Sequence, residues 1–481
     1  MPLIIPGNVA SATASTGYEV ANSCRFNDGD TAYLHKATAA GDRQKWTYSV
    51  WIKRCTLGTN QTWTPVQADS ANANAMSGYF ETDDQFNLYD YNAPGVSAQI
   101  ITNRKFRDIG AWYHFVIAVD TTQGTANNRL RFYVNGVEER GVGGYGTDTM
   151  PAEDYEFNLN QDTEELYIGA NYTSSVSTPS DMYMAEACFI DGTQYAASDF
   201  GEFDEDSPTI WKPKDVSGLT FGDEGFYCDM EASDNLGNDA NGGTDLTESN
   251  LAAADQATDT PTNNFCTGNP LANFYNQTTF SEGNCKATLA SSPYGYDIGT
   301  MGVANGKWYW EIKYTSGSGD PHNVGGFGIS GKGESLTASA WLGYQSGSSS
   351  TDYGYMDEGG TGVLYTNVSG ADTDASRSFA IGNIIGIAID LDSGTHTMTL
   401  YVNGNATTTD NISSSPTSGF YFPAWSYGYS AGGAVFELNF GGCPAYAITS
   451  GNADANGYGN FEYAVPSGYY ALCTKNLAEF G

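Results

Sequence analysis

The chain has 481 residues and a net charge of −36, from 56 acidic and 20 basic side chains. This charge argues against nucleic acid and anionic membranes as partners, because binding to either depends on Lys and Arg neutralising phosphates. Aromatic residues make up 14% of the chain, and 58 glycines and 16 prolines provide frequent turns. The composition therefore predicts an all-β protein, and a length of ~150 residues per domain predicts two or three domains.

Neither an export signal nor a membrane span is predicted. The opening Met-Pro-Leu-Ile-Ile-Pro-Gly has no basic residue and only a short apolar run, and no stretch approaches ~18 apolar residues. The eight cysteines are scattered without zinc or redox spacing: Cys24, Cys55, Cys188, Cys228, Cys266, Cys285, Cys443 and Cys473. We expect reduced, buried thiols in a protein that folds in a reducing cytoplasm, and a disulfide framework is the weaker alternative.

Three strands can be predicted in the first half. Residues 46–53 alternate between apolar and polar side chains, as in a half-buried strand. Residues 115–120 form a continuous apolar run, which suits a strand covered on both faces. Residues 130–134 alternate again and lead into Asn135-Gly136, the preferred pair for a type I′ hairpin turn.

The same order of segments returns in the second half. Residues 308–314 alternate, residues 384–390 form the apolar run, and residues 398–402 lead into Asn403-Gly404 at similar spacing. Matching order and spacing predict two related sandwiches. Tyr133 and Tyr401 should then occupy equivalent strands.

Between the two copies the composition changes. Residues 236–262 are rich in Gly, Asn, Asp, Thr and Ala, with five acidic residues and no basic ones. They predict an acidic linker or a strap laid along a surface, with one helical turn at 252–254. The resulting domains are 1–235 and 266–481, joined by a linker at 236–265.

These residues resemble known families. The first half resembles a laminin G-like domain of the concanavalin A-like superfamily, through Ser23–Asn27, Trp46–Lys53, Gly110–His114, Tyr133–Gly136 and Tyr167–Gly169. The second half resembles a SPRY domain, through Gly306–Glu311, Gly325–Ile329, Ile384–Asp390, Tyr401–Gly404, Phe422–Ala424 and Leu438–Gly441. The resemblance implies two tandem jelly-roll β-sandwiches. Asp181–Glu186 departs from the expected end of the first pattern, which leaves its last strand in doubt.

The pairing of the two modules resembles virion proteins of marine tailed phages, through Trp211–Lys214, Asp259–Asn264 and Leu472–Leu477. This resemblance implies a non-enzymatic fibre, spike or capsid decoration subunit, made in the host cytoplasm and assembled into the virion surface. Its partners would be other virion proteins and a host surface glycan or protein, bound during host attachment by a homo-oligomer. The alternatives are a purely architectural capsid or tail component and a polysaccharide-degrading glycosidase on the same fold.

Catalysis is not expected. Retaining glycosidases need two carboxylates ~5.5 Å apart, and two pairs have same-face spacing: Glu81 with Asp83, and Glu202 with Asp204. Neither pair lies in a predicted strand with aromatic neighbours suited to a sugar cleft. We predict that His114 is a structural histidine and that Glu311 belongs to a polar network in the sheet.

The laminin G-like resemblance also implies a calcium site at a loop rim, because Ca²⁺ prefers several oxygen ligands. The candidate ligands are Asp28, Asp30, Asp83, Asp84 and Asp181. No other cofactor is expected.

Two stretches rich in Tyr, Gly and Ser predict a binding face on the second domain. Exposed aromatic rings stack on sugars, and such loops resemble antibody binding loops. We predict that six rings are displayed at one end of the sandwich: Tyr344, Tyr353, Tyr355, Trp425, Tyr427 and Tyr429. The alternative is ordinary packing in a Tyr-rich β protein.

Overall fold

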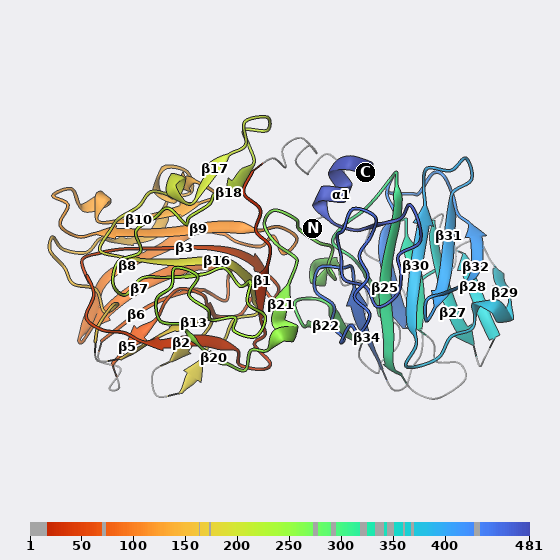
Figure 1. Ribbon diagram of the computed structural model, residues 1–481, viewed down its shortest axis with the longest axis horizontal. Helices are drawn as coiled ribbons and strands as arrows, with labels where there is room; N and C mark the ends of the chain where they lie inside the picture. The colour runs from red at the N-terminus through yellow and green to blue at the C-terminus, as the bar shows by residue number, and fades with distance from the viewer. Residues whose placement is uncertain are drawn as a thin grey trace. The chain divides into compact units, whose positions relative to one another are not determined.

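The computed structural model describes residues 17–481 except for 70–73, 163, 173–174, 273–277, 290–294, 318–324, 332–340, 344–350, 359–360, 367–369 and 428–432. The described chain divides after Thr262 into two compact units, called here the first and second domains. Each domain is a β-sandwich (Figure 1).

The back sheet of the first domain has the order β11-β10-β9-β3-β16-β1-β21, and β19 also pairs with β16. All its neighbours are antiparallel. The strands are β1 (Ser23–Phe26), β3 (Lys45–Arg54), β9 (Tyr113–Asp120), β10 (Leu130–Val134), β11 (Val137–Glu138), β16 (Met182–Asp191), β19 (Phe226–Cys228) and β21 (Gln256–Ala257).

The front layer of the first domain consists of two sheets, with the orders β12-β8-β7-β6-β4 and β13-β2-β20; β5 also pairs with β6. A bridge between Val66 and Tyr167 connects them. The strands are β2 (Tyr33–Ala37), β4 (Gln61–Thr62), β5 (Gln67–Ala68), β6 (Asn74–Phe80), β7 (Gln85–Asn92), β8 (Gly95–Lys105), β12 (Tyr145–Thr149), β13 (Glu165–Ile168) and β20 (Thr247–Ser249). Two short hairpins complete the domain: β14 (Asn171–Tyr172) with β15 (Val176–Ser177), and β17 (Gly201–Phe203) with β18 (Trp211–Pro213).

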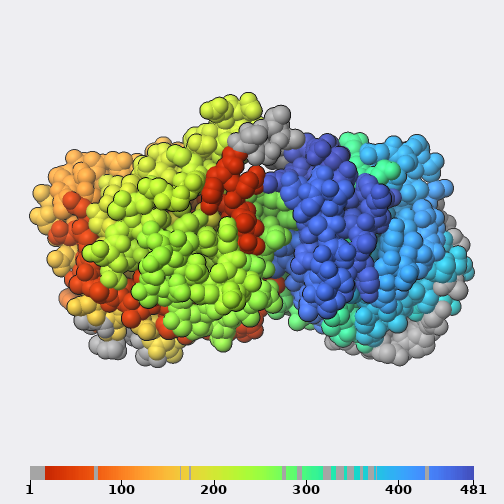
Figure 2. Space-filling model, viewed as in Figure 1, coloured from red at the N-terminus to blue at the C-terminus, as the bar shows by residue number. Residues whose placement is uncertain are grey.

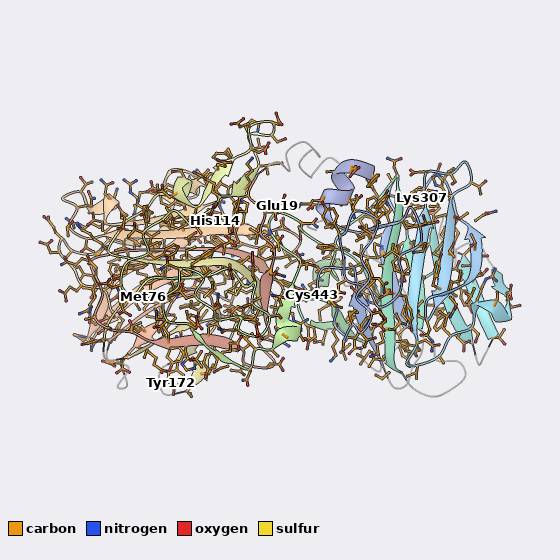
Figure 3. All side chains as sticks on the ribbon, viewed as in Figure 1. Glu19, Met76, His114, Tyr172, Lys307 and Cys443 are labelled. Atoms are coloured by element: carbon orange, nitrogen blue, oxygen red, sulfur yellow. The ribbon has the colours of Figure 1, made fainter. Side chains whose placement is uncertain are left out.

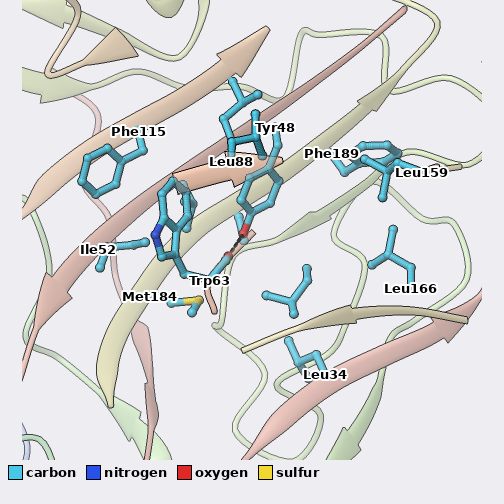
Figure 4. Packing of buried hydrophobic residues seen from close by; sticks show 14 of the residues in the cluster. Leu34, Tyr48, Ile52, Trp63, Leu88, Phe115, Leu159, Leu166, Met184 and Phe189 are labelled. Atoms are coloured by element: carbon cyan, nitrogen blue, oxygen red, sulfur yellow. Dashed lines mark hydrogen bonds between the residues drawn. The ribbon is translucent and has the colours of Figure 1, made fainter. Parts of the chain in front are cut away.

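The core of the first domain lies between these two layers. Its aromatic centre is Trp63, whose ring lies 4.9 Å from Phe115 of the back sheet and 4.8 Å from Phe86 of the front layer. The Tyr48 hydroxyl donates a hydrogen bond to the Trp63 carbonyl, so this buried tyrosine is paired (Figure 4). The predicted alternation in residues 46–53 places Trp46, Tyr48 and the residues in step with them in this core.

Residues after β16 cover the outer face of the back sheet. Figure 2 shows this part of the chain, yellow-green to green, spread over one face of the domain. Within this part of the chain, the Asp259 carboxylate is bound by the Lys53 ammonium at 2.6 Å and by the Trp112 indole N–H at 3.1 Å. The Lys53 and Asp259 side chains are each 1% exposed. The chain enters and leaves the domain at adjacent points, because the Thr262 hydroxyl bonds to both N–H and C=O of Val20.

The predicted linker at 236–265 is therefore wrong. Within it, β20 pairs with β2 and β21 pairs with β1, so these residues belong to the first domain up to Thr262. The predicted helical turn exists as a 3₁₀ turn at Ala253–Asp255. We call residues 236–262 the strap. The polar composition of the strap is typical of a flexible connection. Here, however, its polar residues pair with the first domain, as the buried Asp259 does with Lys53.

The second domain repeats the plan. Its back sheet has the order β22-β23-β34-β25-β30-β31-β32, with β35 beside β25, and its front sheet has the order β24-β33-β26-β27-β28-β29. The elements are β22 (Thr278–Ser281), β23 (Lys286–Leu289), β24 (Gly295–Ile298), β25 (Lys307–Gly317), β26 (Gly325–Ser330), β27 (Asp352–Glu358), β28 (Thr361–Thr366), β29 (Gly370–Thr373), β30 (Ile384–Asp390), β31 (Thr397–Val402), β32 (Asn405–Asn411), β33 (Phe422–Tyr427), β34 (Ala434–Asn439), β35 (Tyr470–Ala471) and α1 (Thr474–Phe480).

The central strands of the two back sheets correspond: β10, β9, β3 and β16 take the places of β31, β30, β25 and β34. In both sheets, the strand that leads into the Asn-Gly turn pairs with the apolar strand. The apolar strand pairs in turn with the Trp-rich strand. Asn135 exchanges two hydrogen bonds with the backbone of His114, and Asn403 does the same with Ile384. Both asparagines have φ of 48°, as a type I′ turn requires. Tyr133 and Tyr401 thus occupy equivalent strands, and the predicted fold class of two tandem concanavalin A-like jelly rolls is confirmed.

The front layers differ in one respect. In the second domain β33, which comes shortly before the last long strand, pairs directly with β26. In the first domain the corresponding strand β13 reaches the larger sheet through the Val66–Tyr167 bridge, with β4 and β5 lying beside β6. The first domain therefore has a wider and less regular outer surface at this point.

All eight cysteines are buried as thiols. Burial raises the pKa of Cys24 and of Cys188 well above the ordinary thiol value. They act as small apolar residues in the sheets, consistent with their strand-like sequence surroundings.

Candidate functional site

The rings predicted to be displayed on the second domain are largely core residues. Trp425 and Tyr355 are 0% exposed, and Tyr427 is 1% exposed. The Tyr355 hydroxyl donates to the Met398 carbonyl at 2.8 Å. Tyr353 is partly buried, and its hydroxyl accepts the Ser413 N–H at 2.9 Å. Tyr344 and Tyr429 lie outside the described residues.

The prediction of display is wrong for the three buried rings because they lie within the strands β27 and β33 with their side chains in the core. In β26 and β27 the glycines permit close backbone approach. A Cβ on Gly354 would lie 2.8 Å from the Leu342 carbonyl, and one on Gly328 would overlap the Tyr353 carbonyl. Glycine within a strand is a known sign of such approach.

The outer face of the front sheet in the second domain is covered by its own chain. Leu342 is buried among Tyr296, Phe422 and Ala424, and its N–H donates to the Ser426 hydroxyl at 2.9 Å. This face is therefore not available to a ligand at that position.

The corresponding outer face of the first domain carries partly exposed aromatic rings. Along β2, Leu34 points into the core while Tyr33 and His35 alternate with it and are partly exposed. Along β13, Leu166 points into the core, while Glu165 is exposed on the outer side and Tyr167 lies on that same side but is buried, at 8% exposed. Because Tyr167 and His35 are direct cross-strand partners, these outward side chains meet on one surface.

Four rings form a contiguous group, called here the ring cluster: Tyr33, His35, Tyr167 and Tyr172. The Tyr167 ring stacks on Tyr172 at 4.5 Å and on His35 at 5.6 Å, with interplanar angles of 11° and 13°. Tyr33 lies 5.8 Å from Tyr167 and is tilted by 51°. Tyr172, in β14, lies at the periphery of the domain (Figure 3).

Glu165 connects two of these rings. Its Oε2 lies 3.1 Å from His35 Nδ1 and accepts the Tyr167 hydroxyl at 2.8 Å. Burial and the Glu165 carboxylate raise the pKa of Tyr167, so its hydroxyl remains a protonated donor. The Glu165 side chain is 44% exposed, so a carboxylate held by the protein also faces solvent.

A second pair of rings, Tyr79 and Tyr89, lies on the outer side of β6 and β7. Their ring centres are 6.1 Å apart, and their planes are inclined by 82°. Asn87, between them in the sheet, donates to the Tyr79 hydroxyl at 3.2 Å and to Glu81 Oε1 at 2.9 Å. Asn171 lies near enough to Tyr89 to act on its pKa, against the burial that raises it, and the next residue, Tyr172, belongs to the ring cluster. We call both groups together the aromatic face.

The predicted calcium ligands are not gathered into one group of side chains. Asp84 is bound by Arg54 at 3.2 Å and by Arg107 at 2.8 Å, and Asp83 by Lys105 at 3.1 Å. The remaining candidates are also placed: Asp28 is exposed, Asp30 accepts the Asn27 amide, and Asp181 accepts the Thr56 hydroxyl. Within the described ranges, no three His, Cys, Asp or Glu side chains are grouped to hold a metal ion. Around Asp83 and Asp84, the basic side chains of Lys105, Arg54 and Arg107 hold the positions that a cation would fill.

The two candidate catalytic pairs have other partners. Glu202 and Asp204 both contact Lys212, at 3.6 and 3.3 Å. The Ser207 N–H, together with Lys212, lowers the pKa of Asp204. A general acid requires the opposite shift. In the other pair, Glu81 accepts the Asn87 amide and Asp83 pairs with Lys105.

Two residues have the structural roles predicted for them. The buried His114 receives the Trp211 indole N–H at Nδ1 and bonds to the Ser49 hydroxyl through Nε2, and burial lowers its pKa to about 3 (labelled in Figure 3). Glu311 is buried and accepts five hydrogen bonds, from the hydroxyls of Tyr309 and Tyr446, the amide of Asn439 and the N–H groups of Glu462 and Tyr463.

Sequence reasoning missed the aromatic face. Its signal was present in the alternation of Tyr33 and His35 with Leu34, and in Tyr167 between two apolar residues. No periodicity within one strand, however, shows that β2, β13 and β14 bring these rings together.

Comparison with known proteins agrees with this architecture. Residues 27–186 match the model of a family described as the concanavalin A-like lectin/glucanases superfamily, and residues 307–442 match the SPRY domain. No curated protein has a sequence that matches the chain significantly. In the part of the chain that the structure describes, no helix is long and apolar enough to cross a membrane.

The similar solved structures include the following three. Domains LG4-5 of the mouse laminin alpha1 chain have 13% identity and a TM-score of 0.28, covering 88% of this chain and 89% of that one. The SPRY domain of human HERC1 has 18% identity and a TM-score of 0.28, and the match covers 37% of this chain and 99% of that one. The carbohydrate-binding module CBM66 from Bacillus subtilis has 7% identity and a TM-score of 0.22, covering 34% and 93%.

The class is thus a two-domain β-sandwich protein. Its domain content is a laminin G-like, concanavalin A-like domain followed by a SPRY domain.

Proposed function

We propose that this chain is a non-enzymatic glycan-binding protein whose binding surface is the aromatic face of the first domain. The observation that carries the proposal is the ring cluster beside the solvent-facing Glu165 carboxylate. Aromatic faces stack on the C–H surfaces of sugars, and polar groups beside them fix the hydroxyls. The front layer supplies both from adjacent strands.

The role of the protein in its biological setting is also a proposal. We place it on the surface of a phage particle, as a homo-oligomeric fibre, spike or decoration subunit that attaches to host glycans. Repetition of weak sites on a particle raises avidity by ~10²–10⁴. The resemblance of Trp211–Lys214 and Leu472–Leu477 to virion proteins supports this role. A cryo-EM map of the particle tests it: two sandwiches at the outer surface support attachment, and burial of the aromatic face against a neighbouring subunit favours the architectural alternative.

The glycan-binding proposal is tested by removing rings. Tyr172→Ala and Tyr33→Ala should each weaken binding to a glycan array by about 5- to 10-fold, since a ring contact contributes about 1 kcal/mol. Both rings are partly exposed, so the melting temperature should hardly change. Tyr463→Ala, which removes a partly exposed ring of the second domain, is the matched control. Binding that survives both first-domain substitutions would contradict the proposal.

A further inference from the structure

The aromatic face is poor in positive charge. Among the strands β2, β6, β7, β13 and β20, the sequence contains a single Lys or Arg, Lys36; the neighbouring β8 adds Arg104 and Lys105, which are paired with Glu139 and Asp83. Lys36 is buried and points inward, with its ammonium 5.7 Å from the centre of the Phe226 ring. A polysaccharide that bears carboxylate or sulfate groups is ordinarily bound by Arg or Lys. These strands do not offer such a group to solvent.

Glu165 gives the face a negative charge at a fixed point. One of its oxygens, Oε2, is occupied by both His35 and Tyr167. Within the described residues its other oxygen, Oε1, makes no hydrogen bond, and the side chain is partly exposed beside the rings. An ionised carboxylate only accepts hydrogen bonds. The Oε1 atom can therefore accept hydrogen bonds from donors such as sugar hydroxyls, and the charge of the carboxylate repels anions.

We propose that Glu165 determines the ligand class: the face takes uncharged glycans, whose hydroxyl groups donate to Oε1, and rejects glycans that carry carboxylate or sulfate groups. This inference rests on the proposed function. His35 and Tyr167 act as positioning residues, because their hydrogen bonds hold the carboxylate against the ring cluster before a ligand arrives. Pre-organisation of this kind reduces the entropy lost on binding.

The test compares glycans that differ only in charge. Each backbone is presented in two forms, for example polygalacturonate against its methyl ester, and a sulfated galactan against the desulfated polymer. We expect the full chain to bind at least one uncharged form about 10-fold more tightly than its charged twin, because the Glu165 carboxylate repels a like charge on the ligand; this ratio corresponds to about 1.4 kcal/mol. Glu165→Gln should reduce that ratio to within about 3-fold.

Glu202→Gln is the matched control, because Glu202 lies on β17, outside the aromatic face, and should leave the ratio unchanged. A preference of the wild-type chain for the charged forms, removed by Tyr172→Ala, would overturn this inference and leave the glycan-binding proposal standing. An unchanged ratio in Glu165→Gln would also overturn it. No binding to any form would overturn both proposals.

Discussion

Two buried carboxyl groups stand out among the individual residues of this protein. Burial raises the pKa of Glu186 to about 7, although the hydroxyls of Tyr227 and Tyr18 donate to it and act in the opposite direction. Burial likewise raises the pKa of Asp297 to about 7, and the Thr278 hydroxyl donates to it. Glu186 also has φ of 52° at an irregularity in β16. Residues 181–186, which depart from the pattern expected for the first domain, thus run into this irregularity.

The raised pKa of Asp297 predicts a pH-dependent stability. Between the ordinary carboxyl value of 3.8 and about 7, the folded protein keeps a proton that the unfolded chain releases. The contribution of this group to the free energy of unfolding therefore falls as pH rises through that window. Asp297→Asn should gain stability relative to wild type by an amount on the order of 3 kcal/mol between pH ~4 and pH ~7.

Calorimetric unfolding at several pH values measures this difference. The control is Asp374→Asn, which changes an exposed carboxyl of the same domain whose pKa is lowered by the Ser376 N–H. A stability difference between wild type and Asp297→Asn that does not change with pH would contradict the prediction.

The strands differ in how well sequence patterns predict them. Regular alternation predicted β3, β10, β25 and β31, and unbroken apolar runs predicted β9 and β30, because their faces are set by the core they contact. The strands β26, β27 and β33 could not be predicted as core elements. In β26 and β27, Gly328 and Gly354 face backbone on one side, and in all three strands aromatic rings face the core. Composition alone does not separate that arrangement from a loop.

The strap yields a prediction for a single segment. Asp259→Asn leaves Lys53 charged and buried, and breaking such a pair costs about 3–5 kcal/mol. The variant should lower the unfolding temperature of the first domain and make residues 247–262 more sensitive to proteolysis. Replacing both partners, as Lys53→Met with Asp259→Leu, should recover much of the loss. Asp255→Asn, which breaks the more exposed pair with Arg25, is the control with a smaller expected effect. Equal losses in both single variants would show that the buried pair does not hold the strap in place.

The whole molecule contains two equivalent back sheets and two different front surfaces. Repetition of segments in the sequence was enough to predict the former, because each repeat occupies the same place in its sheet. The front surfaces depend on which segment comes to lie on each front layer. In the second domain this segment contains Leu342, and in the first domain it is the hairpin that contains Asn171 and Tyr172. Such placement joins residues far apart in sequence, so the sequence pattern of a single chain does not reveal it.

Thiol chemistry provides a prediction for the whole chain. Because all eight cysteines are buried, native protein should react slowly with a thiol reagent, and denatured, unreduced protein should titrate eight groups. Four or fewer groups after denaturation would show that disulfides form, against the expectation of folding in a reducing compartment.

Absence of catalysis is a second prediction for the whole chain. Incubation with polysaccharides that the chain binds should release no reducing ends, because the carboxylates of both candidate pairs are engaged by Lys105, Lys212 and Asn87. Steady release of reducing ends, abolished by Glu81→Gln or Glu202→Gln, would establish the glycosidase alternative.

Hydrogen–deuterium exchange of the full chain, with and without a bound glycan, decides whether the aromatic face is the binding surface, because it locates the contact without substitutions. We expect slower exchange on binding in residues 33–37, 77–91 and 165–172, which form the aromatic face, and unchanged exchange in residues 422–427. Protection confined to the second domain, with no change in β2 or β13, would contradict glycan binding at this face.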